Sequence, residues 1–184
     1  MSTWTAFYVN TDNEKLVTEQ LQTLTGISNV EIGKFPDDLF NNYLLDESAK
    51  PTYLAICKTQ NNWVAVSHNS FNHLEEWSRI ISKNLNTKVI ATIAQNTADV
   101  YYFSLFDNGE KIREIEVCYS ADFEPVNFGK KFDFENEQPG TKQEYDGETE
   151  YYFDIDSMDE YCGHFGLTMQ HEFAEGIWTT LKVT

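Results

Sequence analysis

The residues that could do chemistry in this 184-residue chain are mostly carboxylates near its C-terminal end. Acidic residues alternate with others over 144–150, so in one extended strand their side chains would project on one side. Such a field attracts a basic protein surface and speeds its capture. The candidate partner-binding residues are Glu144, Asp146, Glu148, Glu150, Asp154, Asp156, Asp159 and Glu160.

The same region offers a weaker case for a metal. Asp154-x-Asp156 resembles the start of a calcium loop, but apolar side chains stand where further oxygen ligands are needed. Cys162, His164 and His171 could ligate zinc, yet their spacing is not that of a structural zinc site. The sequence therefore predicts neither a metal nor a cofactor.

The remaining nucleophilic and basic residues do not form a recognisable catalytic motif. Ser70 lies between His68 and His73, but the two histidines are five positions apart, a spacing that does not place them on one helical face. Cys118 lies in a strand-like run without an evident base. The chain lacks a glycine-rich phosphate loop, a nucleophile elbow and a His-Glu-x-x-His motif. These observations do not favour an enzyme.

The composition sets the class of protein and of partner. Hydrophobic residues make up 41% of the chain, enough for a packed core. The net charge is -17, and residues 121–184 carry four basic and fifteen acidic residues, which argues against nucleic acid as a ligand. No apolar run approaches the ~20 residues that span a bilayer. We therefore expect a cytoplasmic protein with no membrane partner and three unpaired cysteines in the core.

One stretch, 88–119, has the clearest pattern. β-branched and aromatic residues fill two runs, and Asp107-Asn108-Gly109 supplies a tight hairpin turn before a third, alternating run. Three antiparallel strands follow from this pattern. Elsewhere the sequence predicts strands over 3–9, 29–35, 53–58, 63–67, 151–155 and 177–183, helices over 12–25, 71–85 and 157–165, and a short helical turn over 37–44.

These elements predict a single α+β domain over 1–184. Its antiparallel sheet would be covered on one face by two or three helices, with a final helix and strand. Residues 121–150 contain several glycines and prolines and few aliphatic residues, so we expect a loop-rich acidic insertion there.

A resemblance extends over residues 63–167. The helix around Trp77, the strand Asp99-Val100-Tyr101-Tyr102-Phe103, the turn ending at Gly109 and the segment 129–135 resemble a broad set of uncharacterised small acidic bacterial proteins. Some such proteins are immunity proteins that bind and silence a toxin, and the resemblance implies that role by analogy.

The charge and the missing motifs favour a non-enzymatic interaction module that binds a basic protein through its acidic surface. An alternative is a small-molecule-binding protein or enzyme, with a pocket between the helix at 71–85 and the sheet lined by Trp63, Trp77, Tyr101 and Phe103. A third is a nucleic-acid mimic whose carboxylates imitate phosphates.

Overall fold

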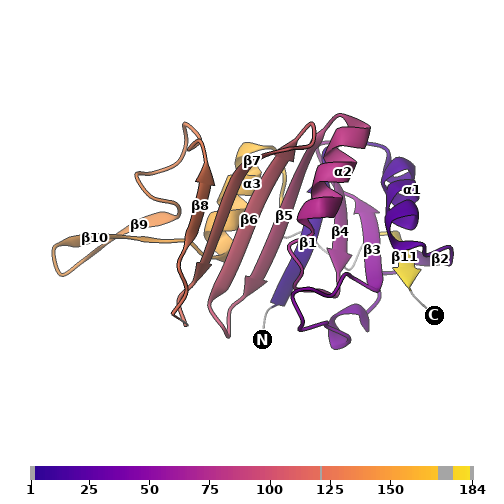
Figure 1. Cartoon of the computed structure of the whole chain (residues 1–184), viewed down its shortest axis with the longest axis horizontal. Coiled ribbons are helices and arrows are strands. Elements are labelled where there is room, and N and C mark those ends of the chain that lie inside the picture. The colour runs from indigo at the N-terminus through magenta and orange to yellow at the C-terminus, as the bar shows by residue number, and fades with distance from the viewer. Residues whose placement is uncertain (1–2, 121, 170–175, 183–184) are drawn as a thin grey trace.

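The computed structural model describes residues 3–120, 122–169 and 176–182. Its main feature is a nine-stranded antiparallel sheet in the order β2-β11-β3-β4-β1-β5-β6-β7-β8 (Figure 1). The strands are β1 (Thr3–Val9), β2 (Val30–Gly33), β3 (Tyr53–Lys58), β4 (Val64–His68), β5 (Lys88–Gln95), β6 (Val100–Asp107), β7 (Glu110–Cys118), β8 (Val126–Gly129) and β11 (Trp178–Lys182). A separate hairpin pairs β9 (Thr141–Tyr145) with β10 (Glu148–Tyr152).

Helices cover both faces of this sheet. α1 (Glu14–Thr25) and α2 (Glu75–Leu85) pack on one face, and α3 (Ile155–His164) packs on the other. The α+β class, the antiparallel sheet and the two helices on one face are confirmed, and the final helix takes the opposite face. A 3-10 turn, η1 (Leu39–Asn41), lies where the short helical turn was predicted.

The central strand β1 shows why the core has two layers. Phe7 and Val9 point to the α1 and α2 side, whereas Ala6 and Tyr8 point to the α3 side, and all four are buried. A strand with both faces covered reads as a nearly continuous apolar run, as this one does.

The turn between β6 and β7 is the one that the sequence predicted. Asn108 and Gly109 have φ values of 56° and 84°, which a two-residue hairpin turn of this hand requires. Helix α2 differs, because it begins at Glu75 and not near residue 71. Leu74 precedes it with φ at 52°, and Ser70 donates to the Ala49 carbonyl (2.5 Å) instead of capping the helix.

The acidic segment 121–150 is loop over 130–140 and carries short strands on either side of that loop. Its hairpin, β9 and β10, extends beyond the β8 edge of the main sheet (Figure 1). Within the described ranges no helix is long and apolar enough to cross a bilayer.

Candidate functional site

The hairpin β9–β10 carries four of the predicted partner-binding residues, but not on one side. The chain reverses at Asp146 and Gly147, and the register places Thr149 opposite Glu144 and Glu150 opposite Gln143. Because neighbours along a strand face opposite ways, Glu144 lies on one face and Glu148 and Glu150 lie on the other. The prediction of one common face is wrong, since it assumed a single extended strand.

The carboxylates of the hairpin differ in their partners. Glu144 pairs with Lys142 at 2.9 Å and accepts a hydrogen bond from Thr149, and these contacts lower the pKa of Glu144. Among the residues that the structure describes, Glu148 and Glu150 make no ion pair, and both are exposed. The face of the hairpin with Glu148 and Glu150 therefore keeps its negative charge uncompensated.

Two of the four predicted residues around α3 have structural roles. Asp154 is the N-cap, where its Oδ1 accepts from the Ser157 amide at 2.9 Å, and Asp159 accepts from the Met169 amide at 2.8 Å. Asp156 and Glu160 are exposed. Five of the eight predicted carboxylates are thus exposed and, among the described residues, make no ion pair.

An open apolar groove of about 390 Å³ lies at the base of the hairpin. It runs between β7, β8 and the hairpin, and Tyr151 lies in its wall. The stack of Tyr119 on Tyr152, with centroids 4.5 Å apart, and the hydrogen bond from the Phe153 amide to the Tyr119 hydroxyl join the hairpin to β7. Its lining residues are Ile115, Val117, Tyr119, Pro125, Val126, Asn127, Gln138, Pro139, Tyr151 and Phe153.

A buried ion pair holds the loop that leads into the hairpin. Arg113 on β7 donates to both oxygens of Glu135, at 2.9 and 2.7 Å, and to the Phe128 carbonyl at 2.7 Å. Glu135 also accepts from the Phe132 amide. The two side chains are 1% and 0% exposed, so every strong polar contact they make is with the protein. No pattern in the sequence marked this pair.

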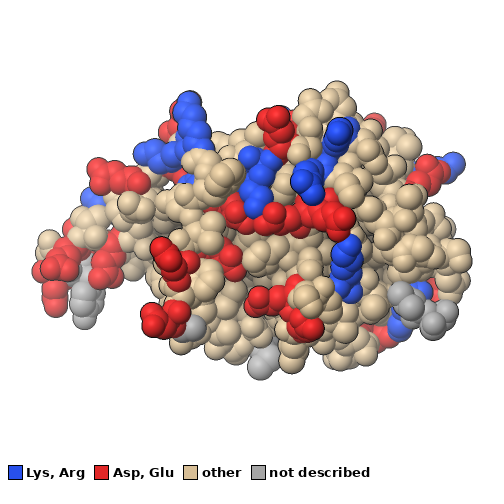
Figure 2. All heavy atoms as spheres, in the orientation of Figure 1, with Lys and Arg blue, Asp and Glu red and all other residues tan. Residues whose placement is uncertain are grey.

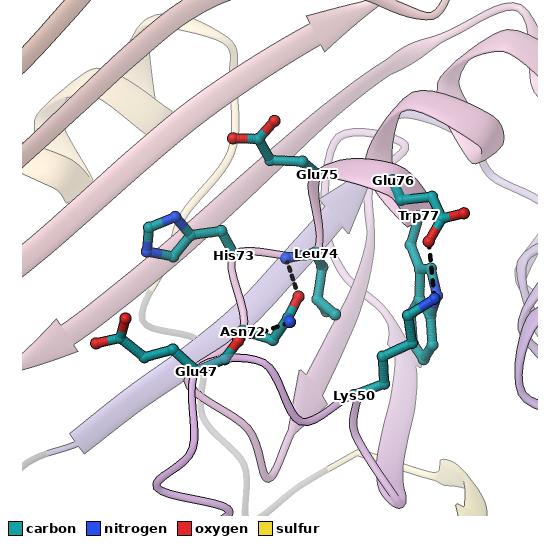
Figure 3. A pocket seen from close by; sticks show the side chains of 8 residues that line it. All are labelled: Glu47, Lys50, Asn72, His73, Leu74, Glu75, Glu76 and Trp77. Atoms are coloured by element: carbon teal, nitrogen blue, oxygen red, sulfur yellow. Dashed lines mark hydrogen bonds and ion pairs between the residues drawn. The ribbon is translucent and has the colours of Figure 1, made fainter.

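A second candidate region lies at the start of α2, where a cavity of about 370 Å³ opens. Figure 3 shows the His73 imidazole and the Glu75 carboxylate directed away from the Lys50–Glu76 ion pair. Leu74 between them has φ at 52°, a conformation that is strained for leucine and that often occurs at functional sites. The Asn72 side chain accepts from the Leu74 amide at 2.9 Å and supports this bend.

Strand β7 brings further charged groups to this region. Lys111 Nζ lies 2.7 Å from Glu75 and 2.9 Å from Glu114, and His73 lies 3.3 Å from Glu116. Burial alone would raise the pKa of Glu75, but the hydrogen bond and charge of Lys111 outweigh it and lower the pKa. Figure 2 shows acidic atoms at the hairpin end of this face and a band of acidic atoms across its middle, with basic atoms above and below that band.

The aromatic pocket expected beneath α2 is not formed. Trp77 belongs to the core on the α1 and α2 side, whereas Trp63, Tyr101 and Phe103 belong to the core on the α3 side. The sheet separates them, so the prediction that they line one pocket is wrong. All four are buried as core residues.

The remaining candidates lie apart from both regions. His68 is buried on β4, and burial lowers its pKa to about 3. Cys162 lies on the buried face of α3, while His164 at the end of that helix is exposed and stacks on Phe134. His171 lies outside the described residues. Of the three cysteines predicted in the core, only Cys162 is fully buried, and Cys57 and Cys118 are half-buried.

Comparisons of the chain with protein-family models, with curated proteins and with solved structures give no match. The resemblance to small acidic bacterial proteins therefore stays a prediction.

Proposed function

We propose that the protein is a non-enzymatic interaction module that binds a basic protein partner in the cytoplasm through its acidic hairpin. The observation that carries this proposal is the position of β9–β10. The hairpin extends past the last strand of the sheet, and its carboxylates are exposed. Negative charge presented in this way steers a basic partner toward the site.

The groove at the base of the hairpin adds an apolar contact surface to the negative charge of the hairpin. Its floor is formed by Ile115, Val117 and Phe153, which suit an apolar side chain of a partner. Exposed acidic residues, Glu124 and Glu137, adjoin the lining residues Pro125 and Gln138. A basic segment with an apolar anchor therefore fits this region better than an acidic or wholly polar one.

The particular role that we propose is that of an immunity protein, which binds and silences a basic toxin. This step rests on analogy with small acidic bacterial proteins and on the absence of a catalytic motif, and not on the geometry of the hairpin. The product of a neighbouring coding region is the first partner to test.

The test compares two variants with the same change in charge. In the hairpin variant, Glu144, Glu148 and Glu150 become Gln; in the control variant, the exposed residues Asp12, Glu31 and Glu110 become Asn, Gln and Gln. Each is immobilised beside the wild type, and the neighbouring product is applied at about 50 mM and at about 300 mM salt, where the Debye length is about 6 Å.

Retention by the wild type and the control, with loss from the hairpin variant and weakening in high salt, is the expected result. Equal retention by all three proteins would overturn the acidic hairpin as the binding surface. Failure of the neighbouring product to bind the wild type at either salt concentration would overturn the immunity role for that pair.

A further inference from the structure

Residues far apart in the sequence meet beside the start of α2 in a geometry suited to a metal ion. His73, Glu75 and Glu114 each offer one ligand atom, and these atoms all lie within 4.8 Å of one another. A point within about 2.8 Å of all three therefore exists, and metal bonds to nitrogen and oxygen are about 2.0–2.2 Å long. Inward movements of less than about 1 Å would close a coordination sphere.

The cluster already holds a cation. The Lys111 ammonium lies 2.7 Å from Glu75 and 2.9 Å from Glu114, between two of the three ligand side chains. Lys111 is 22% exposed and reaches the carboxylates through a flexible stem, so it can withdraw to solvent. The carboxylates would otherwise repel each other.

His73 is held as a ligating imidazole would be. Its ring stacks on Tyr102 with centroids 3.9 Å apart and an interplanar angle of 15°. Its Nε2 lies 3.3 Å from a Glu116 oxygen. In metal sites a carboxylate commonly contacts one imidazole nitrogen, which fixes the ring and leaves the other nitrogen to bind the ion.

Two buried hydroxyls beneath the cluster give an independent indication of a ligand. Ser104 lies directly opposite Glu114 in the β6–β7 register, and Tyr102 lies opposite Glu116, so all four share one face. Both hydroxyls are inaccessible, and within the described part of the chain neither has a hydrogen-bond partner apart from the contact between the two.

A buried hydroxyl that leaves its donor or its acceptor lone pairs unused costs free energy, and an ion or an ordered water often satisfies it. A metal ion bound by three protein ligands retains water in its open positions. Such water would lie over Ser104 and Tyr102 and could hydrogen-bond to them. The hydroxyls and the ligand set therefore point to the same occupant.

We propose that His73, Glu75 and Glu114 bind one divalent transition-metal ion, which displaces the Lys111 ammonium. One imidazole and two carboxylates suit zinc or manganese, whereas calcium and magnesium prefer oxygen ligands alone. This site is independent of the acidic hairpin, so the proposed function and the metal site can each fail without the other.

Neighbouring glutamates provide a matched pair of variants. Glu75 and Glu76 both lie in the first turn of α2, where each compensates the positive end of the helix dipole. Only Glu75 belongs to the cluster, because Glu76 pairs with Lys50 at 2.7 Å. Glu75→Gln and Glu76→Gln therefore share their effect on the helix dipole and on net charge, each removes one ion pair with a lysine, and only Glu75→Gln alters the proposed site.

The experiment is calorimetric titration of the chelator-treated protein with Zn²⁺ and, separately, Mn²⁺. We expect one saturable site in the wild type and in Glu76→Gln, and an affinity at least about tenfold lower in Glu75→Gln and in His73→Gln. Lys111→Met should bind about tenfold more tightly, because it removes the competing charge.

A second measurement guards against variants that lose structure. Circular dichroism before titration shows whether each variant is folded, and Glu75 is exposed enough that its substitution should not disturb the core. Absence of saturable binding by the wild type up to about 1 mM metal would overturn the proposal. Equal affinities for Glu75→Gln and Glu76→Gln would also overturn it, since binding would then come from scattered surface carboxylates.

Discussion

Strand β7 carries charged clusters on both of its faces, and the two differ in how completely their groups are satisfied. On the α3 side, Arg113 and Glu135 are almost inaccessible and every strong polar contact is made within the protein. On the α2 side, Lys111 is 22% exposed and the carboxylates around it are shared with His73. Only one residue, Ile112, separates the two basic residues, and a register shift near Phe106 accompanies their turn to opposite faces.

This difference separates a structural role from a binding role. A buried pair with all its hydrogen bonds made has nothing left to offer a ligand, and it fixes the loop before the acidic hairpin. A half-exposed cluster above two buried hydroxyls can exchange its ammonium for another cation. The arrangement of partners, more than the number of charges, therefore distinguishes the two faces.

The largest effect is expected from removing Arg113, which tests whether the buried ion pair has a structural role. Arg113→Ala leaves the Glu135 carboxylate buried without a counter-charge, which should lower the free energy of unfolding by about 3–5 kcal/mol. Urea denaturation measures the change. The double variant Arg113→Met with Glu135→Leu removes both charges and should recover most of the loss. A loss below about 1 kcal/mol for Arg113→Ala would contradict the structural role.

The α2 side should respond more strongly to acid, because His68 is buried on that face of the sheet. Burial lowers the pKa of His68 from 6.5 to about 3 in the folded protein, so the unfolded chain binds the proton first as pH falls. Stability from this residue is present above about pH 6.5 and is progressively lost toward pH 3. Between pH 7 and pH 4.5 the loss should be about 2–3 kcal/mol.

His68→Leu should flatten this dependence, measured as the free energy of unfolding by urea at several pH values. The comparison uses slopes, so a different stability at neutral pH does not matter. His164→Gln is the control, because it also removes one histidine side chain but leaves the buried His68 in place. An unaltered slope in His68→Leu would exclude His68 as the source.

The α3 side can also be weakened without touching a charge. Gly129 pairs with Arg113 in the β7–β8 register and has φ at +92°, and a Cβ there would clash with the Ile112 carbonyl oxygen. Gly129→Ala should therefore cost about 1–3 kcal/mol in urea denaturation, while leaving affinity for metal at His73 and Glu75 unchanged.

Gly33→Ala is the matched control for this strand-edge substitution. Gly33 also ends an edge strand, but its φ is not in the left-handed region and no atom lies within 4 Å of the added carbon. Its stability should stay within about 0.5 kcal/mol of the wild type. Equal losses in the two variants would show that the close approach at Gly129 is relaxed in solution.

The sequence predicted the local parts of this structure well. The turn at Asn108 and Gly109 and the strands around it follow from the backbone preferences of the residues within the hairpin itself. The start of α2 was missed, because the left-handed conformation of Leu74 is imposed by its surroundings. The sequence pattern also predicted that the buried aromatic residues are apolar strand and helix residues, but it did not predict on which face of the sheet each one lies, because the face depends on strand register.

The two candidate regions also differ in how far the sequence alone could reveal them. The carboxylates of the hairpin are contiguous, so composition alone drew attention to them. His73 and Glu114 are brought together by the pairing of β6 with β7 and by the packing of α2 on them, and no sequence spacing reveals that contact. The same holds for Arg113 and Glu135, since buried charges look like surface charges in a sequence.

The smallest effect is expected at the hairpin itself, where a binding residue should be dispensable for folding. Glu148 and Glu150 are exposed, and within the described residues neither makes an ion pair. Glu148→Gln with Glu150→Gln should therefore change the free energy of unfolding by less than about 0.5 kcal/mol. The same variant should lose retention of a basic partner, so stability and binding separate there. A loss of stability as large as that of Arg113→Ala would instead make these carboxylates part of the scaffold.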